Sequence, residues 1–193
     1  FFDRNQFRTG YATHGLFPYR GKFHPQLARA LLNAMGLQSG DTVVDPMMGS
    51  GTTVVEASIM GMNGIGIDAS PFCQFMASVK LTALTMPLQR VTKALPRCEQ
   101  VFEYFRRKLG SPVRGGKERR APSGGPWNEV CEEGSEYLAG LIGPGPGASK
   151  ELRETYALLL LAYLDSAGYC ERSTRKDPLT QFRAILERYV AVV

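Results

Sequence analysis

Residues 42–68, TVVDPMMGSGTTVVEASIMGMNGIGID, decide how the rest of this sequence is interpreted. A short β-branched run ends in Asp45 and is followed by a turn that contains Gly49 and Gly51. A helical segment comes next, and then a second apolar run that ends in Asp68. This order of strand, glycine loop, helix and strand predicts a nucleotide-binding half-fold of the α/β class with buried, parallel strands.

The two acids that end the strands are expected side by side, because parallel strands open their carboxyl ends onto one ligand crevice. Asp68 lies 19 positions after Gly49 (68 − 49), close to the roughly 20-residue offset at which an acid meets ribose hydroxyls. Gly49 and Gly51 allow positive φ and a close approach of the backbone to a ligand. Thr53-Val54-Val55-Glu56 fits a capping box and predicts the helix start.

The residues after the glycines restrict the choice of ligand. A Walker loop needs a lysine there, but Gly51 is followed by Thr52 and Thr53, so ATP or GTP is not expected through that mechanism. A dinucleotide site needs a small residue at the sixth position, where this sequence has Val54. An acid such as Asp45 suits an ammonium or sulfonium better than a pyrophosphate. The ligand that fits is S-adenosylmethionine.

Three short motifs occur in one order: THGLFPYRGKFHP at 13–25, DPMMGSGTT at 45–53 and GIDASP at 66–71. They resemble, over about residues 11–85, the motifs of amino-group DNA methyltransferases, which make N6-methyladenine or N4-methylcytosine. The first resembles the segment that precedes the cofactor motif in one permuted branch. The second resembles that motif itself, with Met47 where the family usually has Phe or another bulky residue, and the third resembles the ribose-binding acid motif.

This resemblance implies a Rossmann-like S-adenosylmethionine-binding sheet, double-stranded DNA as the partner, and methyl transfer to an exocyclic amino group of adenine or cytosine. It implies that Asp68 holds the ribose, while the other residues lie towards the methionine part of the cofactor. The cofactor-binding residues implied are Phe23, His24, Asp45, Pro46, Gly49, Gly51, Thr52 and Asp68. A simple helix cap is the competing interpretation of His24.

The catalytic loop of such enzymes has Asp, Asn or Ser followed by Pro-Pro and an aromatic, and no such tetrapeptide occurs in these 193 residues. In the permuted order this loop follows a helical insert, beyond Val193. We therefore expect the chain to be the cofactor-binding part of an enzyme, cut where structure continues and inactive alone. Its catalytic residues are unknown.

Composition restricts the class further. The four cysteines contain no Cys-x-x-Cys pair and there are two histidines, so free thiols are expected and a metal site is not. The longest apolar run, 157–164, falls far short of the roughly 20 residues of a membrane helix, and residues 1–10 are too charged for a signal peptide. A soluble, cytoplasmic protein is expected.

The sequence predicts three parts: an α/β cofactor-binding part at 1–86, a basic helix with flexible Gly/Pro-rich loops at 87–148, and a helical insert at 149–193. Helices are expected at 25–35, 72–84, 91–109, 151–167 and 178–189. The first should end at Gly36, with Leu37 making an apolar contact. The residues expected to face inward are Leu27, Leu31 and Met35; Phe72, Phe75, Met76, Val79 and Ala83; Leu95, Cys98, Phe102 and Phe105; Tyr156, Leu159, Leu160 and Tyr163; Phe182, Ile185 and Leu186.

Positive charge is concentrated between Arg90 and Arg120, where ten basic residues face three acids, a local balance of 10 − 3 = +7 within a formal net charge of +5. Clustered Lys and Arg gain affinity for phosphates through counterion release. A solvated linker at 110–126 is the alternative, and the methyltransferase resemblance favours nucleic acid.

Three other functions remain open. The first is an RNA methyltransferase that modifies guanine N2 of transfer RNA, which shares an Asp-Pro-x-x-Gly-x-Gly loop. The second is a non-catalytic module that binds only nucleic acid. The third is a nucleotide-dependent oxidoreductase, which Val54 disfavours.

Overall fold

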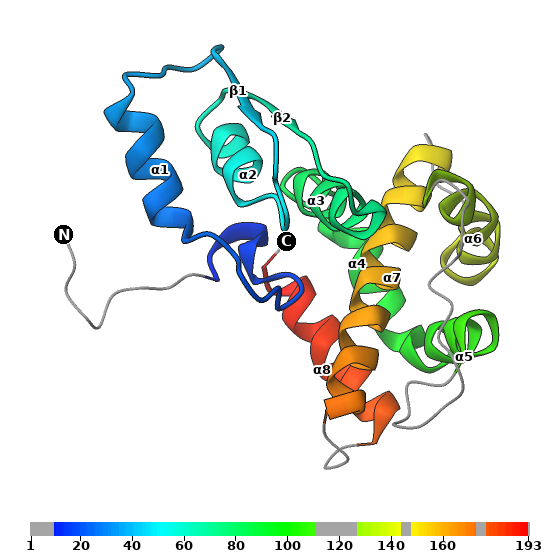
Figure 1. The fold of residues 1–193 in the computed structure, drawn as a ribbon. Helices are drawn as coiled ribbons and strands as arrows, with labels where there is room; N and C mark the ends of the chain where they lie inside the picture. Colours follow the sequence, from blue (N-terminus) through cyan, green and yellow to red (C-terminus); the bar gives the residue numbers. More distant parts are fainter. Residues whose placement is uncertain (1–9, 111–126, 144–147, 173–176, 193) are drawn as a thin grey trace. The chain divides into compact units, whose positions relative to one another are not determined.

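The fold was examined in a computed structural model, which describes residues 10–110, 127–143, 148–172 and 177–192. The chain divides into two compact units, one of Phe1–Leu84 and the other of Thr85–Ala191, with single residues near the C-terminus exchanged between them (Figure 1). Each unit is described by itself.

The first unit is a small α/β assembly built on two parallel strands. Strand β1, Thr42–Asp45, pairs with β2, Asn63–Gly66, and the helix between them is α2, Thr52–Ile59. The unit also contains the 3₁₀ turn η1, Ala12–Gly15, and the helices α1, Pro25–Ala34, and α3, Pro71–Ala83. The mixed α/β class and the strand–loop–helix–strand order are confirmed.

The strands are more exposed than the sequence predicted. Val43 is buried and packs with Leu32, Ala57 and Met62, so α2 covers one face of the sheet. The other large apolar side chains of the two strands are exposed to solvent, Val44 by 56% and Ile65 by 49%, and so is Ile67 just after β2, by 55%. The expectation of strands buried on both faces is therefore wrong for the described part of the chain, where each strand has one paired neighbour.

Helix α1 buries a different face from the one expected. Leu27, Leu31 and Met35 are exposed, Met35 by 71%, whereas Ala28 and Leu32 are buried. The small side chain of Ala28 lets α1 pack closely on α2, and this contact decides which stripe faces inward. The predicted helix end is confirmed, because Gly36 has φ +72° and the Leu37 amide donates to the Leu32 carbonyl at 3.3 Å.

The second unit is helical throughout its described residues. Its elements are α4, Leu88–Ala94; η2, Leu95–Arg97; α5, Cys98–Leu109; α6, Trp127–Ile142; α7, Ala148–Arg172; and α8, Pro178–Val190. The single helix predicted at 91–109 is interrupted by η2, where Pro96 lacks an amide hydrogen and breaks the α-helical pattern. Helix α6 was not predicted.

The inward faces predicted for the helices of the second unit are confirmed, except that Leu95 is only partly buried. Phe102, Phe105, Tyr163 and Phe182 form one aromatic cluster in the core. Gly134 explains how α6 packs on α7, because a Cβ there would lie 2.0 Å from the Tyr156 ring.

The predictions about the cysteines and about the basic loop involve some residues that the structure does not describe. Cys73, Cys98 and Cys170 are buried thiols that are in no disulfide among the described residues, in line with the prediction, whereas the side chain of Cys131 lies outside them. Residues 111–126, which hold several of the basic residues and were predicted to form a loop, also lie outside the described residues. None of the helices in the described ranges is long and apolar enough to cross a membrane.

Candidate cofactor site

The two strand-end acids lie at the same edge of the sheet. Asp45 pairs in register with Gly66, and the Ile67 amide donates to the Asp45 carbonyl at 2.8 Å. Asp68 follows one residue later. The side-by-side placement that the sequence predicted is therefore present, at the carboxyl ends of two parallel strands, where α/β folds open their ligand crevice.

Asp68 has a role within the protein that the sequence did not indicate. Its carboxylate accepts the Gly49 amide on Oδ2 and the Ser70 amide on Oδ1, both at 2.8 Å. The bond from Ser70, and to a smaller extent that from Gly49, holds the pKa of Asp68 below its usual range. The carboxyl group is therefore anionic at neutral pH. Cys73 also hydrogen-bonds to this carboxylate, which still has lone-pair capacity for a ligand hydroxyl.

The glycine loop is closed by its own hydrogen bonds. The Met48 amide donates to the Ile67 carbonyl at 3.0 Å, and the Gly51 amide donates to the Met48 carbonyl at 2.8 Å. With Gly49 bound to Asp68, the amides of both loop glycines are satisfied within the protein. The bond from Gly51 closes the loop on itself, and those from Met48 and Gly49 fix the loop to the residues that follow β2.

A positive φ explains why residues 49 and 51 are glycines, and close packing adds to it at Gly51. Gly51 has φ +78°, and a Cβ on it would lie 2.7 Å from the Cβ of Ala77 on α3. Gly49 has φ +51° and contacts the Tyr19 ring, which would lie 3.5 Å from an added Cβ. The strand, the loop and α3 thus converge at Gly51.

Close packing also occurs between α2 and β2. A Cβ on Gly64 would lie 3.1 Å from Val54. The small residue that a dinucleotide fold requires on the helix is here supplied by the strand. Helix and strand therefore pack closely although Val54 is not small, so the size of Val54 is no argument against a dinucleotide.

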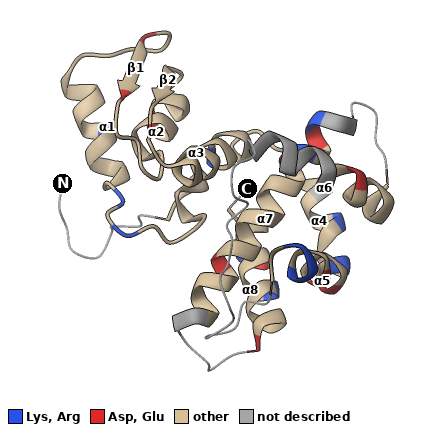
Figure 2. Cartoon of the chain, turned by 45° about the vertical axis from the view of Figure 1, so that its right-hand side comes forward, with Lys and Arg blue, Asp and Glu red and all other residues tan. Residues whose placement is uncertain are grey.

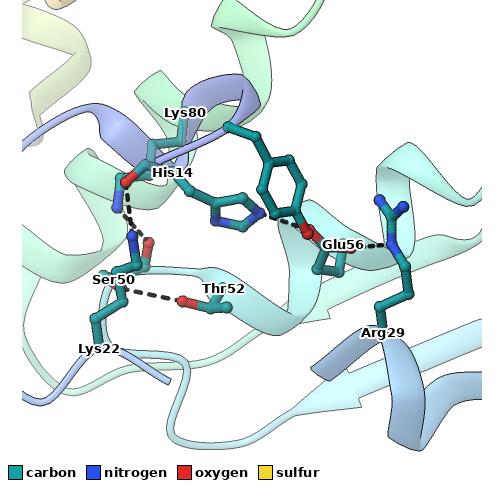
Figure 3. Close-up of polar contacts among 8 residues, drawn as sticks. His14, Lys22, Arg29, Ser50, Thr52, Glu56 and Lys80 are labelled. Atoms are coloured by element: carbon teal, nitrogen blue, oxygen red, sulfur yellow. Dashed lines mark hydrogen bonds and ion pairs between the residues drawn. The ribbon is translucent and has the colours of Figure 1, made fainter. Parts of the chain in front are cut away.

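The predicted capping box is absent. Gly51, not Thr53, is the N-cap of α2, with no side-chain capping bond. Glu56 instead turns into the protein, where its side chain is fully buried. It accepts hydrogen bonds from the Tyr11 hydroxyl, from Nε2 of His14 at 2.7 Å and from Nε of Arg29 at 2.7 Å (Figure 3).

Burial and hydrogen bonding set the charges in the cluster formed by Tyr11, His14, Arg29 and Glu56. Desolvation lowers the pKa of His14, so its imidazole is neutral and donates from Nε2 to Glu56. Desolvation by itself raises the pKa of Glu56, but the bonds from His14, Tyr11 and Arg29 outweigh it and leave a lowered pKa. Arg29 is therefore the cation that balances a buried carboxylate.

A second buried polar side chain, Lys80, is hydrogen-bonded to the glycine loop. Lys80 of α3 is fully buried, and its Nζ donates to the Ser50 carbonyl at 3.1 Å (Figure 3). Burial, and then the charge of Lys22, lower the pKa of Lys80 to about 7. Nζ of Lys22 in turn donates to the His14 carbonyl at 2.8 Å. Lys80 thus connects α3 to the loop that carries both glycines.

The other predicted site residues are more scattered. Phe23 is 43% exposed and Pro46 is exposed. His24 is the N-cap of α1, where its carbonyl accepts the Leu27 and Ala28 amides; no side-chain cap bond forms. Thr52 is buried, with Oγ1 3.4 Å from Oγ of Ser50. Their roles in cofactor binding stay predictions.

Sequence reasoning missed Glu56 and Lys80 as buried polar groups. A signal existed for Lys80, since it follows Cys73, Met76 and Ala77 at the spacing of one helical face and was enclosed by apolar neighbours. Glu56 had no such signal, because its partners lie 27 to 45 positions away.

Comparisons with known proteins agree with these features. Residues 16–102 match the family described as RMKL-like, methyltransferase domain. The type II methyltransferase M.MjaII of Methanocaldococcus jannaschii is 43% identical over 97 residues, which are 50% of this chain and 18% of that protein. The type II methyltransferase M.BsoBI of Geobacillus stearothermophilus is 33% identical over 96 residues, with the same two shares.

A tRNA (guanine(10)-N2)-dimethyltransferase of Methanothermobacter thermautotrophicus is 40% identical over 52 residues, 27% of this chain and 16% of that protein. The aligned part is thus under a fifth of each of these relatives. The search of solved structures gave no match. Residues 16–102 are therefore similar to a methyltransferase domain, and the resemblance to methyltransferases that the motifs indicated is confirmed.

Proposed function

We propose that this chain is the S-adenosylmethionine-binding part of a DNA methyltransferase that modifies an exocyclic amino group of adenine or cytosine. The observation that carries the proposal is the pair of carboxylates at adjacent strand ends, Asp45 and Asp68, joined by a glycine loop that is hydrogen-bonded to Asp68. The type II methyltransferase relatives support it.

The residues at this edge fit the cofactor. Asp45 uses Oδ1 for the Met47 amide at 3.2 Å, and no bond to its Oδ2 is described, so that oxygen suits the ammonium of the methionine part. Asp68 retains lone pairs for ribose hydroxyls. The N-terminal end of α2, beginning at Thr52, carries the positive end of a helix dipole and suits the methionine carboxylate.

When bound, S-adenosylmethionine supplies an electrophilic methyl group. The task of this chain is to hold that group in a fixed direction, because near-attack positioning supplies much of the rate in such transfers. The hydrogen bonds of Gly49, Met48 and Lys80 stiffen the loop before a ligand arrives. In the methyltransferases that the motifs resemble, a polar residue and an aromatic of a Pro-Pro loop receive the target base, and these 193 residues contain no such loop.

Transfer RNA is the second candidate substrate, since relatives named as tRNA (guanine(10)-N2)-dimethyltransferases also match this chain. The type II relatives have the wider alignments, 97 and 96 residues against 52 and 66. We therefore place DNA first.

The test uses the complete gene product and S-adenosylmethionine with a tritiated methyl group. The proposal expects label in duplex DNA, found by mass spectrometry as N6-methyladenine or N4-methylcytosine, and little label in transfer RNA. Asp45→Asn should incorporate less label than wild type at limiting cofactor, because its cofactor binding is expected to be weaker. Label in transfer RNA as N2-methylguanine, with DNA unlabelled, would select the second candidate instead.

A further inference from the structure

The second unit has an open groove along α5 whose lining differs from the apolar core. Its volume is about 560 Å³. The lining residues are Pro96, Arg97, Glu99, Gln100, Glu103, Tyr104, Arg107 and Tyr137. It is formed wholly by residues of this unit and is independent of the candidate cofactor site.

The groove follows one stripe of α5. Gln100, Tyr104 and Arg107 are separated by four and three positions and lie along a single face of α5, and Arg97, the N-cap of α5, precedes them by one turn. Tyr137 of α6 closes the other side, with its ring stacked on Tyr104 at a centroid separation of 4.0 Å and an interplanar angle of 10°.

The tyrosine wall is rigid because it is held from both sides. The Tyr137 hydroxyl donates to the Gln100 carbonyl at 3.1 Å, which ties α6 to α5. The Tyr104 ring also lies edge-on to Phe105 and Tyr156 in the packed interior. A rigid wall reduces the entropy that a ligand must lose on binding.

Among the described residues, the arginines of the groove differ from Arg106 in their hydrogen bonds and ion pairs. Arg106 is bound to Glu103 through Nε and Nη2, with a shortest distance of 2.7 Å. No hydrogen bond or ion pair of Arg97 or Arg107 is found among the described residues. Glu103 is thus paired with Arg106 and also interacts with the charge of Arg107, and Glu99 is the other acid of the groove.

The surrounding charge is positive. Between Leu88 and Leu109 there are six basic residues and two acids, a balance of 6 − 2 = +4. Figure 2 shows basic positions gathered on α5. Guanidinium groups match phosphate oxygens through paired donors, and tyrosine hydroxyls also bind phosphates.

We propose that this groove binds the phosphate backbone of duplex DNA, with Arg97 and Arg107 contacting phosphates and the Tyr104–Tyr137 stack forming the wall along which the strand lies. The inference rests on the proposed function in one respect, that the partner is DNA. It assigns contact with DNA to α5 of the second unit, which is separate from the cofactor-binding residues.

The experiment measures binding of a fluorescein-labelled 20-base-pair duplex by fluorescence anisotropy over a range of salt concentrations. The variants are Arg97→Ala, Arg107→Ala and both together, and Arg106→Ala is the matched control because it removes the same charge from the same helix turn. Circular dichroism checks that each variant is folded.

The double variant is expected to lower the slope of log affinity against log salt by about 1.8, since each lost phosphate contact removes about 0.9. Arg107→Ala should weaken binding about tenfold at low salt, and Arg106→Ala should have a much smaller effect. Equal effects of Arg106→Ala and Arg107→Ala would overturn the proposal, since general charge would then explain the affinity.

Two further outcomes separate this inference from the proposed function. Unchanged duplex affinity in the double variant, with S-adenosylmethionine binding intact in the same protein, would refute the groove and leave the function standing. Tighter binding of single strands or transfer RNA than of the duplex by the wild-type chain, lost in the double variant, would keep the groove but reject duplex DNA as its partner.

Discussion

The buried carboxylate of Glu56 gives the sharpest prediction on stability. It accepts hydrogen bonds from three side chains, Tyr11, His14 and Arg29, and joins the N-terminal segment to α2. Glu56→Ala leaves the hydroxyl and imidazole donors buried without their acceptor. Breaking a buried charged network by removing one partner costs about 3–5 kcal/mol. Arg29 is 40% exposed and can turn to water, which places the expected loss at the lower end, about 3 kcal/mol.

Glu56→Gln refines this estimate. The amide keeps the volume and one acceptor oxygen, but its NH₂ group meets a donor from Arg29, so we expect a loss of about 2 kcal/mol. The pKa of Glu56 is lowered in the folded state. Its contribution is therefore fully present above the unfolded pKa of about 4.5 and is lost as the pH falls through the folded pKa. The difference between wild type and Glu56→Gln should shrink in that acidic range.

The assay is urea unfolding by circular dichroism at pH 7 and pH 4, combined with hydrogen exchange of peptides from residues 25–60. Exchange reports the first unit even where the second unfolds separately. Glu103→Gln is the control, because Glu103 also binds an arginine, Arg106, but is exposed to water. A Glu56→Gln protein with wild-type urea midpoint and exchange at pH 7 would refute the network as a stabilising element.

Three other outcomes follow from the same structure. Gly51→Ala should lower the free energy of unfolding in urea by more than about 2 kcal/mol, because a positive φ combines with a 2.7 Å approach of the new Cβ to Ala77. Gly36→Ala, with a positive φ and no atom within 4 Å of the new Cβ, should cost only about 1 kcal/mol. Equal losses in the two variants would contradict the packing at Gly51. Because the pKa of Lys80 is lowered to about 7 in the folded state, the unfolded chain binds more protons than the folded chain above that pH. The free energy of unfolding of the wild type should therefore rise by about 2 kcal/mol between pH 7 and pH 9, and this rise should be absent in Lys80→Met. Identical dependence of stability on pH in the two proteins would refute the pKa shift. Gly64→Ala should loosen α2 on β2, because its Cβ would lie 3.1 Å from Val54; we expect faster hydrogen exchange in α2, and unchanged protection would argue against that contact.

Local signals in the sequence predicted local structure well. The end of α1 at Gly36 depends on one residue with positive φ and one following apolar contact, and both are adjacent in sequence. The strand and helix order between Thr42 and Asp68 was likewise visible, because strand and helix patterns alternate over a short span.

The sequence predictions were wrong where contacts between residues far apart in the sequence determine the structure. The stripe of Leu27 and Leu31 is as apolar as that of Ala28 and Leu32, and only the close approach of α1 to α2 selects the second. Glu56 at the third position after Thr53 matched a capping box, but three side-chain donors from earlier in the chain hold it in the interior. A local motif cannot reveal a stronger partner that lies tens of residues away.

Within the candidate site, the neighbouring positions of Asp45 and Asp68 were predictable from the parallel arrangement. The bond between the Gly49 amide and Asp68 was not, because it depends on how the loop folds back on β2. It gives Asp68 two tasks, fixing the loop and facing a ligand, and a test of the second task must therefore preserve the first.

Titration calorimetry with S-adenosylmethionine is the most direct test of the cofactor site. Asp45→Asn changes the acid that has a carboxylate oxygen without a described bond, and it leaves the Gly49–Asp68 bond in place. The account predicts saturable one-to-one binding by the wild-type chain, weakened about tenfold in Asp45→Asn, with no binding of NADH. Equal affinity of wild type and Asp45→Asn, or NADH binding in place of S-adenosylmethionine, would contradict it.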